Sequence, residues 1–293
     1  QDFEMPPKKR LSDAIVDDFR KWIEMGAPDP RKTEIAQVRS QISAEDIAEA
    51  KQEFWAYQKP LMPAIPAIHD ESWPRRELDR FVLAGLENVQ LSPVADAESS
   101  QVLRRLCYDL IGLPPSRQQS QDFVRSWKKN PDQAIAAMVD ELLDSPQYGE
   151  RWGRHWLDLA RYAESNGREV NMTNPHAWRY RDYVIDSFNA DKPYDRFVLE
   201  QIAGDLLPAK DDAQWAQNLI ATSFLALGPK SLSERNGAQF AADLADEQLD
   251  TTTRVMLGTS VACARCHDHK FEPIPQADYY ALAGIFASTE TYY

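Results

Sequence analysis

Cysteine, glycine and long apolar runs are all scarce in this chain of 293 residues, which holds three cysteines and 11 glycines. Three cysteines are too few for the disulfide framework of a small secreted domain. So few glycines, in a chain whose apolar residues are spaced by threes and fours, argue against a turn-rich β-sandwich or barrel. No window holds the roughly eighteen uncharged apolar residues of a membrane span, and no secretory signal is recognisable.

Positive charge is also in deficit, because 33 Lys and Arg face 46 Asp and Glu, a formal net charge of −13. That balance excludes a protein that binds nucleic acid through bulk basic charge. No nucleotide-binding glycine loop is recognisable, which argues against hydride transfer from a nicotinamide cofactor. The absence of a fixed-period repeat argues against a solenoid.

Helical periodicity is the main positive signal. We expect a multi-helix, mainly α fold with little or no sheet, because apolar residues recur at helical spacing between Pro and Gly terminators. The predicted helices span residues 12–26, 44–57, 75–89, 97–111, 117–128, 132–144, 147–164, 176–189, 194–206, 213–226, 240–261 and 276–288.

The domain organisation follows from the Pro-punctuated stretch at 59–74, which we interpret as a linker. Residues 1–58 would then form a helical head segment, and residues 75–293 one helical domain. The helix at 12–26 carries a wide apolar stripe that requires a partner.

One short motif points to a bound cofactor. Cys263-Ala264-Arg265-Cys266-His267 is a C-x-x-C-H sequence, the signature of one covalently attached haem c. Two thiols three positions apart can add to the two vinyl groups of a porphyrin, and the adjacent His267 can bind the iron as proximal ligand. Three alternatives stay open: a zinc site completed by His269, a thioredoxin-like redox pair, and two structural thiols. The third cysteine, Cys107, is predicted to be a small core residue.

Several longer blocks then point to a family. The blocks are Arg265–Ile274 followed by Asp278-Tyr279-Tyr280, Tyr148–Trp152 continuing through His155–Ala163, Ala177–Val184, Asp109–Pro115 and Asp246–Asp250. Together they resemble the second planctomycete-type cytochrome C domain over roughly residues 70–290. The opening segment is similar to the last part of the first such domain, in which Met5 would be an axial ligand, although the first 60 residues hold no C-x-x-C-H string.

The resemblance implies a haem-bearing, exported protein, often joined to a further domain and found in polysaccharide-degrading bacteria. Thioether attachment of haem takes place outside the bacterial cytoplasmic membrane, so we expect a periplasmic or cell-surface location. The partners implied are a redox partner protein or domain and a possible carbohydrate substrate.

Candidate roles around the iron are distributed over two segments. His155 is a candidate sixth ligand or general base, or else an ordinary histidine. Asp158 and Arg161 are predicted to pair at i, i+3 or to orient a haem propionate, with Tyr162 and Trp156 at the same helical spacing. His269 follows His267 too closely to share its direction, so we expect it at a propionate or a neighbouring carboxylate.

Two further clusters have open interpretations. Arg179 lies in the aromatic and cationic run Trp178–Asp182, which suits a haem edge, a sugar ring or a cation–π seam in the core. Four acids fall along one predicted helix and suit either a calcium ion or a solvated face, namely Asp243, Asp246, Glu247 and Asp250.

Three functions are consistent with these features. The first is an electron-transfer cytochrome with a six-coordinate iron. The second is a haem oxidoreductase or peroxidase-like enzyme with an open sixth position, in which the distal set would be His155, Asp158, Arg161 and Tyr162. The third is a binding module that haem stabilises. The sequence favours a redox protein, with electron transfer ahead of catalysis.

Overall fold

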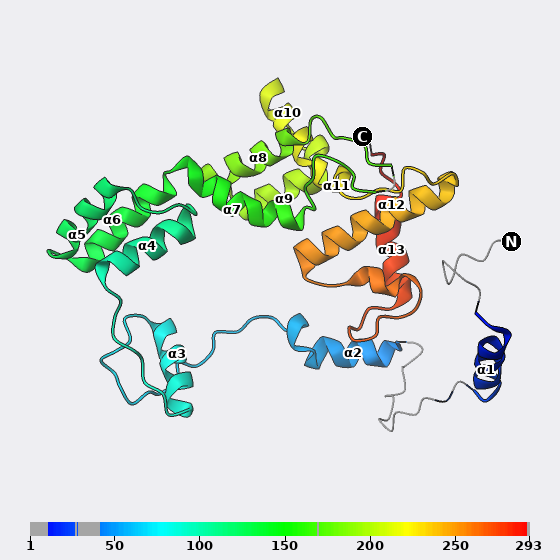
Figure 1. The fold of residues 1–293 in the computed structure, drawn as a ribbon, viewed down its shortest axis with the longest axis horizontal. Helices are drawn as coiled ribbons and strands as arrows, with labels where there is room; N and C mark the ends of the chain where they lie inside the picture. Colours follow the sequence, from blue (N-terminus) through cyan, green and yellow to red (C-terminus); the bar gives the residue numbers. More distant parts are fainter. Residues whose placement is uncertain (1–10, 27, 29–41, 169, 292–293) are drawn as a thin grey trace. The chain divides into compact units, whose positions relative to one another are not determined.

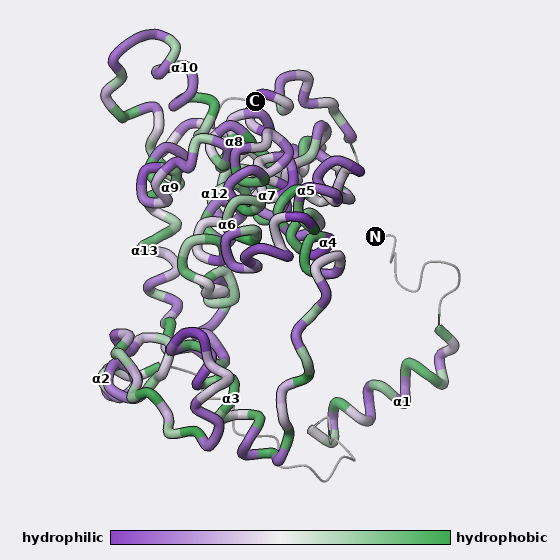
Figure 2. The backbone as a smooth tube through the Cα atoms, turned by 90° about the vertical axis from the view of Figure 1, so that its left-hand side faces the viewer, coloured by the Kyte–Doolittle hydropathy of each residue, from purple (hydrophilic) through white to green (hydrophobic). Residues whose placement is uncertain are grey.

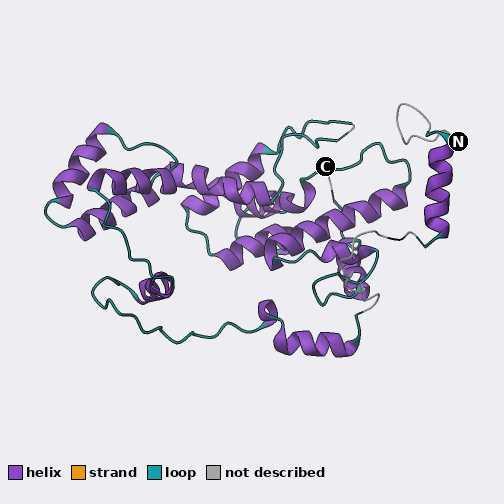
Figure 3. Cartoon of the chain, turned by 60° about the horizontal axis from the view of Figure 1, so that its bottom comes forward, coloured by secondary structure: helices purple, strands orange, loops and turns teal. Residues whose placement is uncertain are grey.

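The computed structural model describes residues 11–26, 28, 42–168 and 170–291. Within those ranges the chain is helical and has no β-sheet, because the one strand-like pairing is an isolated antiparallel bridge between Ser165 and Thr173 (Figure 3). The predicted mainly α fold is confirmed. None of the helices in the described ranges combines the length and the hydropathy needed to cross a bilayer.

The chain divides into two compact units, residues 1–40 and 41–293. The first unit contains α1 (Asp13–Glu24), whose end is marked by Gly26 at φ +84°. Hydrophobic and hydrophilic residues are mixed along α1 (Figure 2), and its apolar side chains are exposed, Phe19 by 54% and Ile23 by 64%. Met5, the predicted axial ligand, lies outside the described residues.

The second unit begins with α2 (Ala44–Glu53), the short 3₁₀ helix η1 (Trp55–Tyr57) and α3 (Glu77–Asn88). Ser43 and Asp46 form a reciprocal capping box that starts α2. The Pro-rich stretch from 59 to 68 has no regular secondary structure. The proposed division into a head segment, a linker and a helical domain stays a prediction.

Three helices then pack around one small core: α4 (Ser99–Leu110), α5 (Arg117–Trp127) and α6 (Pro131–Leu143) (Figure 1). Their core residues are Leu103, Cys107, Phe123, Ala134, Met138 and Leu142. Cys107 is fully buried, and burial raises the pKa of its thiol. The prediction of a core cysteine is therefore confirmed.

A second core joins α7 (Pro146–Leu159), α8 (Trp178–Asn189), α9 (Tyr194–Ala203), α10 (Asp212–Ala221) and α11 (Ser223–Ala226), with η2 (Gly204–Leu206) beside them. α7 and α8 lie side by side (Figure 1) and approach closely at Gly149, where an added Cβ would meet the carbonyl oxygen of Ile185 at 2.5 Å. The glycine in the block Tyr148–Trp152 therefore serves helix packing.

The third core joins α12 (Gly237–Thr252), the 3₁₀ helix η4 (Val261–Arg265) and α13 (Gln276–Phe286). Leu249, Val261, Ala264, Ile274 and Tyr279 are its buried members. This core holds the C-x-x-C-H segment in place from its inner side.

Several predicted helices differ from the structure at their ends, and at two of them a residue in a left-handed conformation marks the difference. The helix predicted at 147–164 ends at Leu159, because Arg161 adopts a left-handed conformation with φ +55°. The helix predicted at 240–261 stops after a π-helical turn, η3 (Thr253–Leu257), where Gly258 has φ +67°. Apolar spacing continues across both breaks, so periodicity alone does not reveal them.

Candidate functional site

The C-x-x-C-H segment is a short 3₁₀ helix with its reactive groups facing outward. In η4 the side chains of Val261 and Ala264 are buried, whereas Cys263 and Cys266 are exposed and form no disulfide. Cys266 caps the helix with right-handed helical dihedrals. A 3₁₀ helix has three residues per turn, so side chains at i and i+3 lie on the same side. Both thiols are therefore presented in one direction.

His267 follows directly, and its ring is exposed. Its Nδ1 lies 2.7 Å from the carbonyl oxygen of Asp268, which can only accept a hydrogen bond. Nδ1 thus carries the hydrogen of the neutral ring, and Nε2 keeps its lone pair. Such a hydrogen bond fixes the tautomer in which Nε2 binds a metal ion.

His269 is buried and is committed to the loop. Its Nδ1 accepts hydrogen bonds from the backbone N–H groups of Phe271 at 3.2 Å and Glu272 at 2.8 Å. Its Nε2 lies 3.1 Å from Oγ of Ser260 and 3.4 Å from the Glu272 carboxylate. Both ring nitrogens are engaged, so in this geometry His269 shapes the loop and has no free lone pair for iron or zinc.

Two residues anchor the segment to its neighbours. Arg265 donates to Asp243 at 2.8 Å and Asp246 at 3.0 Å on α12, and these contacts raise the pKa of its guanidinium. Asp268 accepts from the backbone N–H of Gln276 at 2.7 Å and from that of Ile42. These two hydrogen bonds lower the pKa of the Asp268 carboxyl. Arg265 and Asp268, which lie next to the outward-facing Cys266 and His267 in the sequence, therefore hold the backbone of the segment in place.

The donor set fits haem c better than the alternatives. A porphyrin requires two thiols on one side and an imidazole lone pair next to them, and Cys263, Cys266 and His267 supply these groups. A zinc site would need His269 as a fourth ligand, and no group of three or more His, Cys, Asp and Glu in the described ranges is arranged to hold a metal ion. A thioredoxin-like pair follows a β-strand, whereas Gly258–Ser260 precede η4 here.

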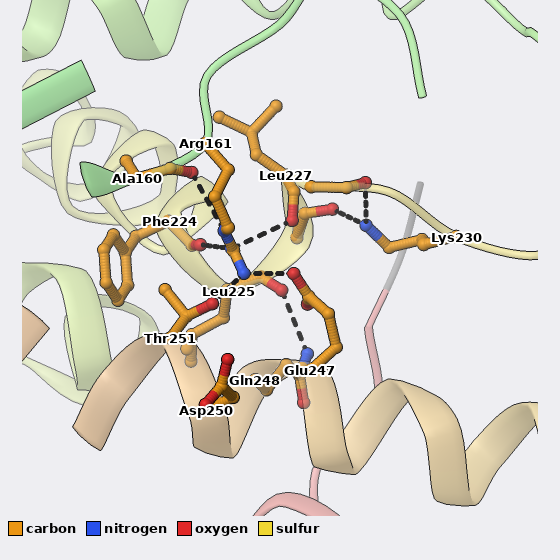
Figure 4. Close-up of polar contacts among 12 residues, drawn as sticks. Ala160, Arg161, Phe224, Leu225, Leu227, Lys230, Glu247, Gln248, Asp250 and Thr251 are labelled. Atoms are coloured by element: carbon orange, nitrogen blue, oxygen red, sulfur yellow. Dashed lines mark hydrogen bonds and ion pairs between the residues drawn. The ribbon is translucent and has the colours of Figure 1, made fainter. Parts of the chain in front are cut away.

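Arg161 lies in a different environment from the one predicted. It does not pair with Asp158, because Nη1 binds the Glu247 carboxylate and the Thr251 hydroxyl of α12 (Figure 4). Nη2 donates to the carbonyl oxygens of Phe224 and Leu227, each at 3.1 Å. The side chain starts from the first residue after the helix cap, a position that usually takes glycine, and turns inward from there. Local spacing gave the wrong partner because the real one is on a distant helix.

The other three members of the predicted distal set do not gather around Arg161. His155 and Asp158 are exposed on α7, and the His155 ring contacts Trp152 at a centroid distance of 5.4 Å. Tyr162 donates to Glu164 at 3.1 Å, and burial together with this carboxylate raises its pKa to about 12. The elements that pack on η4 are chiefly α12 and α13, not α7.

Trp156, predicted near the cofactor, lies in the second core. It is 7% exposed, and its Nε1 donates to the Tyr180 hydroxyl at 3.1 Å and to Gln201 at 2.8 Å. Tyr180 and Trp156 belong to two of the blocks that carry the family resemblance. Their hydrogen bonds show that these blocks are adjacent in the fold.

Arg179 is exposed, and its guanidinium lies 5.4 Å from the Trp178 ring centroid. Both residues line a cleft of about 440 Å³ beside α8 and α10, together with Asp182, Asp186 and Gln217. The pair therefore lies in a surface cleft and not in a core seam, the last of the three settings considered from the sequence.

The four acids of α12 are each bound to an arginine. Asp243 and Asp246 hold Arg265, Glu247 holds Arg161, and Asp250 accepts from Arg254 at 2.7 Å. Asp243 is exposed and the other three acids are half-buried, so the face is only partly solvated, and the carboxylates that a calcium ion would need are paired with arginines. The sequence did not single out Asp268 or Lys230, although Asp268 lies within the C-x-x-C-H-D-H block.

Fold and site together define an α-helical domain with an outward-facing C-x-x-C-H segment. A profile of the family PSCyt2, described as "Protein of unknown function (DUF1549)", matches residues 77–291. The match covers well over half of the chain, and the protein belongs to this family. Searches of curated proteins and of solved structures returned no match.

Proposed function

We propose that this protein is an exported c-type cytochrome domain that transfers single electrons to or from a partner protein or domain. The observation that carries the proposal is the C-x-x-C-H segment, whose two thiols share one side while Nε2 of His267 keeps its lone pair. When bound, haem c supplies one-electron chemistry at its iron.

Each residue of the segment has a distinct role in this proposal. Cys263 and Cys266 would hold the porphyrin through thioether bonds, and His267 would bind the iron. The backbone carbonyl of Asp268 would orient the imidazole of His267 and make its Nε2 a stronger electron-pair donor to the iron. Arg265 and Asp268 fix the backbone so that the three groups keep their relative positions.

The location and the partners belong to the same proposal. Covalent attachment implies maturation outside the cytoplasmic membrane, hence a periplasmic or cell-surface site. The family resemblance adds a possible link to sugar or polysaccharide oxidation. Electron transfer is preferred to catalysis because His155, Arg161 and Tyr162 contact different neighbours and Asp158 is exposed on α7, so the four residues do not form one distal cluster.

The test is a visible spectrum of the protein purified from a host that matures c-type cytochromes, first oxidised, then reduced with dithionite, then exposed to carbon monoxide. Sharp low-spin bands that carbon monoxide does not change are expected for an electron carrier with two protein ligands. A high-spin spectrum that shifts with carbon monoxide would favour the haem-enzyme alternative. Absence of a Soret band in exported protein would contradict the haem assignment.

A further inference from the structure

A cavity of about 490 Å³ reaches the C-x-x-C-H segment from the side of α12. Ala262 and Cys263 form part of its lining, and so do Glu247 of α12 and Lys230 of the loop that follows α11. A group that changes charge at Cys263 and a group that titrates at Glu247 would therefore line the same cavity.

The two carboxylate oxygens of Glu247 differ in their hydrogen bonding. Oε1 accepts from Arg161, whereas Oε2 is buried and receives no hydrogen bond from the described residues (Figure 4). Burial raises the pKa of this carboxyl, although the positive charges of Arg161 and Lys230 act in the opposite direction. A buried carboxylate oxygen without a donor is a favourable place for a proton.

The charges around Glu247 come from every element that packs against it. Arg161 approaches from the end of α7, Lys230 from the loop after α11, and Asp250 from the next turn of α12. Lys230 is itself held by the carbonyl oxygens of Ala226 and Gly228, and burial lowers its pKa.

The other charged groups that line the cavity are Arg168, Glu234, Asp243, Asp246 and Arg254. Asp243 and Asp246 are neutralised by Arg265, and Asp250 by Arg254. Glu234 is exposed and accepts from the backbone N–H of Asn236 at 2.7 Å. Within the described lining, Glu247 is thus the acid whose buried oxygen lacks a donor.

We propose that Glu247 is a redox-linked proton-binding site, which takes up a proton on Oε2 when the haem held by Cys263, Cys266 and His267 is reduced. The inference rests on the proposed function. One electron from an external one-electron donor would convert ferric to ferrous iron, and one hydrated proton from the solvent would bind Oε2, while no bond of the protein breaks. The added negative charge disfavours the carboxylate, and the low dielectric of a buried site strengthens this effect.

The sign of the pH dependence follows. Reduction raises the affinity of Glu247 for a proton, so raising the pH through the titration window of this group makes reduction harder. The midpoint potential should fall with pH inside that window and level off on either side of it. For one proton per electron, the limiting slope is about 59 mV per pH unit, because a tenfold change in proton concentration corresponds to that potential.

The experiment measures the midpoint potential of the full chain by redox titration between about pH 5 and 9, for the wild type, Glu247→Gln and Glu234→Gln. Glu234→Gln is the matched control, because it makes the same chemical change at an exposed acid of the same cavity. The wild type and the control should show the pH-dependent segment, and Glu247→Gln should show a flat profile there. A pH-dependent segment that persists in Glu247→Gln would overturn the proposal.

Two controls distinguish failure of the proton-site proposal from failure of the proposed function or of folding. Haem bands are recorded first, so a chain without haem contradicts the proposed function and not the proton site. If Glu247→Gln does not fold, the wild type alone still decides, because infrared difference spectra between the reduced and oxidised states should show a new protonated carboxyl band. A flat wild-type profile without such a band would refute the role of Glu247.

Discussion

Arg161 and Glu247 are 86 positions apart in the sequence, and their ion pair ties the end of α7 to α12. The pair is largely shielded, since the side chains are 23% and 19% exposed. Removing one partner of such a pair leaves an uncompensated charge. The pair therefore links the aromatic core to the helix that supports the C-x-x-C-H segment.

Arg161→Ala is expected to lower the free energy of unfolding by about 3–5 kcal/mol, because Glu247 and the carbonyl oxygens of Phe224 and Leu227 lose their donor. Chemical denaturation followed by circular dichroism measures the loss. The matched control is Arg254→Ala, whose arginine is 60% exposed in an ion pair with Asp250 and should cost less than about 1 kcal/mol. Equal effects of the two substitutions would contradict the buried role of Arg161.

Gly149→Ala should destabilise the contact between α7 and α8, because the new Cβ would meet the Ile185 carbonyl oxygen at 2.5 Å. Overpacking of this kind costs about 1–3 kcal/mol. Gly284→Ala in α13 is the control, since its Cβ would meet nothing within 4 Å and alanine favours a helix by about 0.5–1 kcal/mol. Thermal melts should move in opposite directions for the two variants.

The hydrogen bonds of the Asp268 carboxylate should stabilise the fold at neutral pH and lose this effect in acid. Its carboxyl has a lowered pKa because it accepts hydrogen bonds from the backbone of Gln276 and Ile42. A lowered pKa means that the contribution is present above the ordinary carboxyl value of about 3.9 and disappears as the pH falls through the lowered one. Melting temperatures of the wild type and Asp268→Asn should therefore differ at neutral pH and converge in acid. A difference that grows in acid would contradict this assignment.

The two histidines of the C-x-x-C-H-D-H block should respond differently to alanine. His267→Ala is expected to retain covalent haem and lose the low-spin iron spectrum. His269→Ala should keep the low-spin spectrum but reduce stability by about 1–3 kcal/mol, because the N–H groups of Phe271 and Glu272 lose their buried acceptor. Absorption spectra and denaturation of both variants measure these effects. A reversed pattern would assign the proximal ligand to His269.

Much of the fold follows from local sequence, since Pro146, Pro193 and Gly112 mark helix limits that the structure reproduces. The breaks at Arg161 and Gly258 were missed for a physical reason. Arg161 has φ +55° without being glycine, and tertiary contacts with α12 hold it there. Local periodicity carries no information about such contacts.

In the candidate site, too, some features follow from local sequence and others depend on contacts between distant segments. The C-x-x-C-H spacing singles out Cys263, Cys266 and His267 as the proposed haem-binding residues, because covalent attachment of haem c uses that order of residues. The separate role of His269 depends on Ser260 and on a reversal of the backbone that brings Glu272 back to it. The partners of Arg265 on α12 likewise depend on how distant segments pack, so only the structure reveals them.

The most direct test of the central claim is the intact mass of the exported protein under denaturing conditions, compared with that of the Cys263→Ala/Cys266→Ala double variant. The wild type is expected to carry the additional mass of one haem and to stain for haem after denaturing electrophoresis, while the double variant carries neither. A wild-type chain at its bare polypeptide mass, or a double variant that retains covalent haem, would contradict the account.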